Sequence, residues 1–172
     1  MLAALRSADK EEAGRLAEWF VRYPDNEATS RVRALVGNEY KQEWELTLNL
    51  AGMADVGALD WAEVFRSSTD EDRWIAFYVF ACSPLPRADK IAKQVIHGND
   101  VSALVGLIQG YKESRNPMRW DRLREIIELK TKDKKVDYWL RITLEEMADD
   151  GDHQAEILLG ILSPEPETRP EN

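Results

Sequence analysis

Apolar residues recur every three to four positions along most of the chain, which is the spacing that places them on one face of an α-helix. Signals for helix starts and stops alternate closely with these stretches: Asp, Asn or Thr at the starts, and Gly or Pro at the stops. Nothing alternates with a period of two over a useful length, so the pattern predicts no β-sheet. The expected start signals are Asp9, Asp25 or Asn26, Asn38, Asp60, Thr69, Asn99, Asn116, Asp133 and Asp152.

These signals predict an all-α protein of about nine or ten short antiparallel helices, because tight links join helices that run in opposite directions. Two arrangements fit: an irregular helical bundle, or a short stack of helix pairs of the α-solenoid type. Residues 1–162 are expected to form one domain, since 172 residues is the length of a single domain. Residues 163–172 contain three prolines and no other apolar residue, which predicts a disordered, acidic and proline-rich tail.

One segment is ambiguous by pattern alone. Residues 74–82 form an unbroken apolar run of nine residues, which is typical either of a buried strand or of a buried helix. Thr69 and Asp72 form a capping-type pair ahead of the run, and no second strand-like segment is present to pair with it. We therefore predict a central helix that is buried on all sides.

The charge of the chain bears on its partners. The sequence has 32 acidic and 23 basic residues, a net charge of −9 and a pI near 4.8. Nucleic acid is disfavoured as the main ligand, because affinity for it comes largely from neutralising phosphates. Residues 112–135 nevertheless hold nine bases with five interleaved acids, which predicts a solvated helix face and leaves contact with an anion as the alternative.

Cysteine usage and apolar run length bear on location. Cys82 is the only cysteine, so no internal disulfide forms, and a reducing compartment is expected. The first residues turn charged without a long apolar stretch, and the longest apolar run is about half of what crosses a bilayer. These features predict a cytoplasmic protein without a membrane contact.

Residues that commonly carry catalysis or bind metals are sparse. His97 and His153 have no second histidine or cysteine at ligand spacing, and Cys82 lies inside the most apolar run, which predicts a buried, inert thiol. Residues 149–152 fail the spacing of a calcium loop and are typical of a helix stop followed by a cap. No phosphate-binding glycine loop or nucleophile motif is present. We therefore predict no enzyme activity, no metal and no cofactor.

Tryptophan is abundant, with six in the chain. Most are expected in the core, and one or two are expected at the surface, because tryptophan is enriched at binding hot spots. Those at helical core spacing are Trp19, Trp44, Trp120 and Trp139.

The last third of the chain resembles the tetratricopeptide-like helical repeats. The matching residues are Ala148, Gly151, Ala155, Leu159 and Gly160, in the pattern of a glycine that ends one helix and small residues that admit the next. A similar segment begins at Gly98, which lies 53 residues before Gly151, compared with roughly 34 in such repeats. The resemblance implies a scaffold of helix pairs that binds other proteins.

Acidic residues crowd the expected helix–turn–helix corner near residue 150. Glu145 and Glu146 lie toward the C-terminal end of a helix, where the helix dipole disfavours negative charge. With Asp149 and Asp150 they are expected to contact a basic protein partner, such as one that processes nucleic acid. The predicted function is thus a cofactor-free binding module of the inhibitor or immunity type. The alternatives are a structural subunit or adaptor, including a homo-oligomer, and a helical enzyme that uses carboxylates.

Overall fold

The computed structural model describes residues 1–36, 69–114, 116–130 and 132–162. Helices make up 81% of these described residues, which contain no strand. The all-α prediction is therefore confirmed. The helices expected after Asn38 and Asp60, with Trp44, and the expected tail 163–172 lie outside the described residues.

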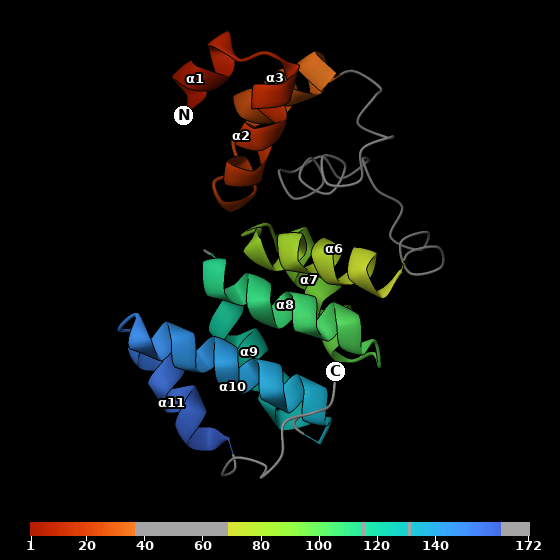
Figure 1. The fold of residues 1–172 in the computed structure, drawn as a ribbon, viewed down its shortest axis with the longest axis vertical. Coiled ribbons are helices and arrows are strands. Elements are labelled where there is room, and N and C mark those ends of the chain that lie inside the picture. The colour runs from red at the N-terminus through yellow and green to blue at the C-terminus, as the bar shows by residue number, and fades with distance from the viewer. Residues whose placement is uncertain (37–68, 115, 131, 163–172) are drawn as a thin grey trace.

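Two groups of helices succeed one another along the chain (Figure 1). The N-terminal group consists of α1 (Leu2–Ser7), α2 (Lys10–Arg22) and α3 (Asn26–Val36). The second group consists of α6 (Asp70–Cys82), α7 (Pro86–Ile96), α8 (Val101–Glu113), α9 (Arg119–Lys130), α10 (Lys134–Asp149) and α11 (His153–Ile161).

Side-chain caps set several of the helix starts, as the start signals predict. The Asp9 carboxylate accepts the Glu12 backbone N–H at 2.9 Å, and Asp133 accepts those of Lys135 and Val136. The cap of α8 differs from the expectation. Asp100, not Asn99, accepts the first-turn N–H of Ala103 at 3.0 Å. Asp100 has the extended backbone of an N-cap, and its other carboxylate oxygen lies 2.7 Å from Arg73 Nε of α6.

The second group is built from three successive helix pairs: α6–α7, α8–α9 and α10–α11. Helix α6 packs on α8 and α8 packs on α10, while α7 packs on α9. Equivalent helices begin 31 to 34 residues apart, at Asp70, Val101 and Lys134 for the first helices and at Pro86, Arg119 and His153 for the second. This order of packing is similar to that of a helix-pair stack, although α11 packs chiefly on α10 rather than on α9.

The closest approach in the stack is between α6 and α8. A Cβ atom added to Gly106 would lie 2.2 Å from the Trp74 carbonyl oxygen, and one added to Gly110 would lie 2.3 Å from that of Tyr78. The two glycines lie four residues apart on one face of α8, so the backbones of the two helices are in direct contact. Any larger side chain at either position would force the helices apart.

Helix α6 is the apolar run over 74–82, so the prediction of a helix rather than a strand is confirmed. Phe77 is fully buried and Cys82 is 2% exposed. Burial raises the pKa of the Cys82 thiol to about 12, which keeps it protonated near neutral pH. The predicted burial of this cysteine is confirmed.

The N-terminal group shares the same apolar core. Phe20 and Val21 of α2 are buried with residues of α6 and α8 in one cluster, and α2 also contacts α6. Trp19 is 36% exposed, so it is a surface tryptophan of the kind expected for one or two of the six. The inward positions of α2 are taken by smaller residues and Phe20, and Trp19 stacks on Tyr23 at the edge with ring centroids 4.2 Å apart.

None of the described helices combines the length and the apolar character needed to cross a membrane.

Candidate functional site

The four acidic residues singled out by sequence lie on the hairpin formed by α10 and α11. Gly151 ends α10 with a positive φ of 88°, a conformation that favours glycine. The Asp152 N–H donates to the Met147 carbonyl at 3.0 Å, and the Asp152 carboxylate in turn accepts the Gln154 N–H at 3.1 Å. A stop and a cap at the adjacent residues Gly151 and Asp152 therefore set a tight turn.

We call Glu145, Glu146, Asp149 and Asp150 the acidic corner. All four residues are exposed. Glu145 and Asp149 lie four residues apart, on one side of α10, and neither makes a hydrogen bond or ion pair with a described residue. The structure thus brings the four acids together at an accessible position, and two of them have no counter-ion in the described chain.

Glu146 differs from Glu145 and Asp149, because a base from another helix is paired with it. Lys112 Nζ at the end of α8 donates to Glu146 Oε2 at 2.9 Å. This hydrogen bond raises the pKa of Lys112. The nearest base along the chain is Arg141, which pairs with Asp137, so sequence position alone did not reveal the pair of Glu146 with Lys112.

Asp152, next to the acidic corner, is neutralised in the same way. Arg119 Nη2 donates to Asp152 Oδ2 at 3.0 Å, and its Nη1 donates to the Ser114 carbonyl at 2.7 Å. The guanidinium also lies over the Trp120 ring, 4.4 Å from its centroid. Part of the basic stretch 112–135 is therefore engaged within the protein.

An open, polar groove lies beside the acidic corner, between the hairpin and the link from α8 to α9. Two adjoining depressions of about 430 and 530 Å³ form it, and Lys112, Glu113 and Arg119 line both. The first is completed by Met147, Asp150, Gly151, Asp152 and His153, and the second by Ser114, Asn116, Pro117 and Trp120. Sequence reasoning did not identify Glu113 or Arg119 as neighbours of the corner. These neighbours could have been found from the repeat spacing of the helices, because the paired residues Arg119 and Asp152, and Lys112 and Glu146, lie 33 and 34 residues apart along the chain.

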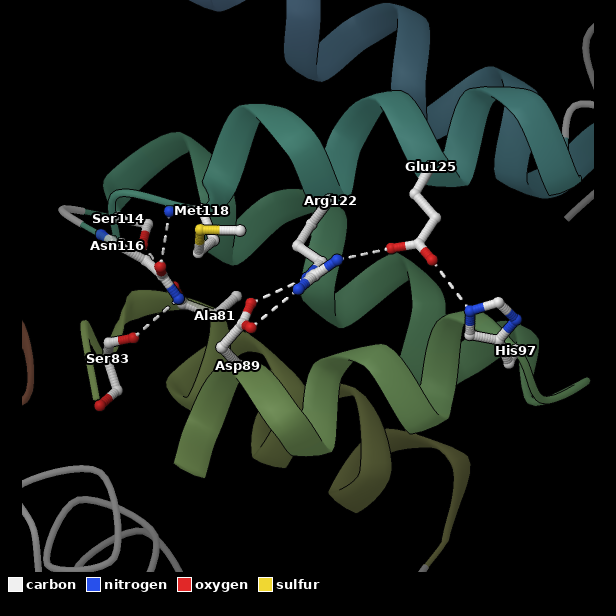
Figure 2. Close-up of polar contacts among 9 residues, drawn as sticks. All are labelled: Ala81, Ser83, Asp89, His97, Ser114, Asn116, Met118, Arg122 and Glu125. Atoms are coloured by element: carbon white, nitrogen blue, oxygen red, sulfur yellow. Dashed lines mark hydrogen bonds and ion pairs between the residues drawn. The ribbon is translucent and has the colours of Figure 1, made fainter. Parts of the chain in front are cut away.

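Hydrogen bonds from Asn116 and Ser114 fix the wall of this groove (Figure 2). The Asn116 amide donates to the Ser83 carbonyl at 3.2 Å, and its oxygen accepts the Met118 N–H at 2.9 Å. The Ser114 hydroxyl donates to the Ala81 carbonyl. The link before α9 is thus pinned to the link after α6. Asn116 was expected to cap the helix with Pro117 at its first position; the Asn116 oxygen does accept a backbone N–H, but Pro117 and Met118 form a turn and α9 begins at Arg119.

A second polar cluster joins α7 to α9 (Figure 2). Both oxygens of Asp89 accept from Arg122, each at 2.8 Å, and Arg122 also donates to Glu125 at 2.8 Å. Glu125 bonds His97 Nε2 at 2.9 Å. The hydrogen bonds with Asp89 raise the pKa of Arg122. Because Arg122 is already paired with Asp89 and Glu125, the cluster links the first helix pair to the second.

Within the described parts of the chain, no three histidine, cysteine or acidic side chains are grouped so that they could hold a metal ion. Residues 149–152 form the stop and cap described above. Comparisons with protein-family models, with curated proteins and with solved structures found no match for this chain.

Proposed function

We propose that the chain is a cofactor-free protein-binding module, of the acidic inhibitor or immunity type, that docks on a basic partner protein through the acidic corner. The observation that carries the proposal is the pair Glu145 and Asp149, exposed and without a described counter-ion. Both lie in the last turns of α10, where the helix dipole disfavours negative charge by up to about 1 kcal/mol each. A basic partner would offset this cost.

The rigidity of the hairpin supports the same proposal. Its turn is set by Gly151 and Asp152, and ion pairs to Lys112 and Arg119 fix it to α8 and α9. A fixed array of charges raises the rate of association with an oppositely charged surface and makes that rate sensitive to salt. Proteins that process nucleic acid carry such basic surfaces, because they neutralise phosphates. The proposed partner is therefore a protein of this class.

Two further features belong to the proposal. The helix-pair recurrence at 31 to 34 residues supports the resemblance to tetratricopeptide-like repeats and, with it, a scaffold that binds other proteins. A cytoplasmic setting is proposed because the only cysteine is a buried free thiol, which suits a reducing compartment.

The test is affinity capture from a native lysate of the source cells, with identification by mass spectrometry. Three versions of the full chain serve as bait: the wild type, a site variant with Glu145→Lys, Asp149→Lys and Asp150→Lys, and a control variant with Glu71→Lys, Asp121→Lys and Glu128→Lys. All six acids are exposed, so both variants change the net charge equally. Glu146 is left intact, because its pair with Lys112 is part of the fold.

The proposal expects a basic protein that the wild type and the control variant capture and the site variant does not. Its association rate with the purified wild type should exceed that with the site variant by about tenfold in low salt. A captured partner that binds all three versions equally would show that the acidic corner contributes only to solubility.

A further inference from the structure

The helix-pair stack ends, within the described residues, on the α10–α11 pair. Figure 1 places α11 at the far end of the molecule from α1–α3, and α11 packs chiefly on α10. By contrast, α9 packs on α7, α8 and α10. The last pair thus has a preceding pair on one side and no described helix on the other.

Equivalent positions in α9 and α11 differ sharply in burial. The fifth and ninth residues of α9 are Leu123 and Ile127, which are 0% and 5% exposed. The fifth and ninth residues of α11 are Ile157 and Ile161, which are 41% and 51% exposed. Two isoleucines therefore remain at the surface at positions that are buried in α9, whereas the same positions of α7 hold the exposed polar residues Lys90 and Gln94.

The first helices of the pairs point to the same open face. Lys112 is the twelfth residue of α8, and from there it reaches Glu146 on the next first helix, α10. The twelfth residue of α10 is Glu145. Glu145 thus stands at the position from which a first helix contacts its successor, and Asp149 lies one turn further on. We call Glu145, Asp149, Ile157 and Ile161 the open end.

The charge of this face selects what can cover it. Residues 142–162 contain six acids and no lysine or arginine. A second copy of the chain would bring two such segments together, because a twofold interface places the same patch opposite itself, and like charges would repel. Residues 163–172 offer no apolar side chain beyond proline. The complement is a helix with one apolar side and lysine or arginine along its margin.

We propose that the partner contributes a basic amphipathic helix that adds to the stack at the open end. Its apolar side packs on Ile157 and Ile161, and its lysines or arginines lie opposite Glu145 and Asp149. This inference rests on the proposed function and names the partner segment that the acidic corner recognises. An amphipathic helix on an apolar helix face is an established mode of peptide recognition.

The first experiment uses model peptides and the full-length chain. A fluorescent helical peptide of about 18 residues, five turns, carries leucine on one side and lysine on the other. A second peptide has glutamate in place of lysine, and a third has the lysine peptide's composition in scrambled order. Fluorescence anisotropy should show binding of the first peptide, with at least about tenfold weaker binding of the other two.

Variants of the chain assign the site. Ile157→Ser with Ile161→Ser should weaken binding of the lysine peptide about tenfold or more. The matched control is Met118→Ser with Leu129→Ser, since these residues are 37% and 48% exposed and lie outside the open end. The control should bind as the wild type does. Circular dichroism and melting curves establish that each variant is folded, and the single variants Ile157→Ser and Ile161→Ser replace the pair if it is not.

Equal binding of the lysine and glutamate peptides would overturn the inference, as would wild-type binding by the isoleucine variant. Sedimentation provides another opposing outcome: a wild-type dimer that the isoleucine changes convert to a monomer would identify a second copy as the occupant. A wild-type monomer agrees with the inference.

The lysate capture separates this inference from the proposed function. If the site variant, with its acids changed to lysine, loses the partner and the isoleucine variant keeps it, the added helix is overturned and the proposed function stands. Loss with both variants, and retention with both controls, supports both. Retention of the partner by every variant contradicts both.

Discussion

The contact between α6 and α8 is apolar and tight, whereas the α10–α11 hairpin at the end of the same stack is acidic and open. At the first, two glycines let backbones touch, so there is no space that a side chain could enter. At the second, Ile157 and Ile161 of α11 and the acids Glu145 and Asp149 of α10 are exposed. The comparison shows that the same kind of helix packing can stabilise the fold at the α6–α8 contact and leave a surface free for binding at the α10–α11 hairpin. Substitutions in the interior should reduce stability, and those at the hairpin should alter binding alone.

The largest effect is expected at the glycine contact. Gly106→Ala and Gly110→Ala each place a methyl group within 2.3 Å of a backbone carbonyl of α6, which should cost about 3 kcal/mol of unfolding free energy or abolish folding. Gly160→Ala on α11 is the matched control, since nothing lies within 4 Å of its added Cβ. It should raise stability by about 0.5 kcal/mol. Urea unfolding measures all three, and a harmless Gly110→Ala would refute the tight contact.

The next largest effect concerns the ion pair that joins α7 to α9. Asp89→Asn removes the charge that Arg122 contacts through two hydrogen bonds, and should cost about 2 kcal/mol. Glu11→Gln is the control, because its pair with Arg15 is exposed and 3.6 Å long, and should change stability by less than about 0.5 kcal/mol. Similar unfolding curves for the two variants would mean that the partly buried pair of Asp89 and Arg122 adds nothing to stability.

The interior should also give the protein a specific sensitivity to alkali. The Cys82 thiol, with an ordinary pKa of 9.0, has its pKa raised to about 12 by burial in the folded state. Between these values the unfolded chain loses the proton and the folded chain keeps it. Stability should therefore fall as pH rises through this window, by at most about 1.4 kcal/mol per pH unit for this group. Burial raises the pKa of Tyr111 in the same direction, which steepens the fall.

Cys82→Ala isolates the contribution of the thiol. The variant loses packing at every pH, but its stability should decline less steeply with pH than that of the wild type above about pH 9. Unfolding curves at neutral and alkaline pH measure the two slopes. Parallel slopes would exclude the thiol as the group responsible.

The smallest effect on stability is expected at the hairpin. Reversing Glu145, Asp149 and Asp150 to lysine should leave the melting temperature unchanged or raise it slightly, because repulsion at the end of α10 is relieved by a few tenths of a kcal/mol per residue. The same variant should lose the partner, so stability and binding separate at this site. A variant that unfolds instead would place these acids among the residues that hold the fold.

Helix starts and stops could be predicted because they depend on a few adjacent residues. The caps by Asp9, Asp133 and Asp152 and the stop at Gly151 need only a local backbone and one side chain. The helix at the apolar run 74–82 was predicted, but its burial on all sides was not found, because Trp74, Ile75 and Tyr78 are only partly buried. The sequence predicted the cap of α8 at Asn99, one residue too early, because the actual cap, Asp100, also forms an ion pair with Arg73 of α6.

The acidic corner could be recognised in the sequence because its residues are adjacent along the chain. Which of those acids carries a counter-ion could not be predicted, since the partner of Glu146 is Lys112 of α8, 34 residues away. The exposure of Ile157 and Ile161 was equally hidden, because their helical spacing is also that of core residues. Local hydrogen bonds and apolar periodicity thus define the helices, whereas the packing of one pair on the next decides which charges are neutralised and which apolar side chains remain uncovered.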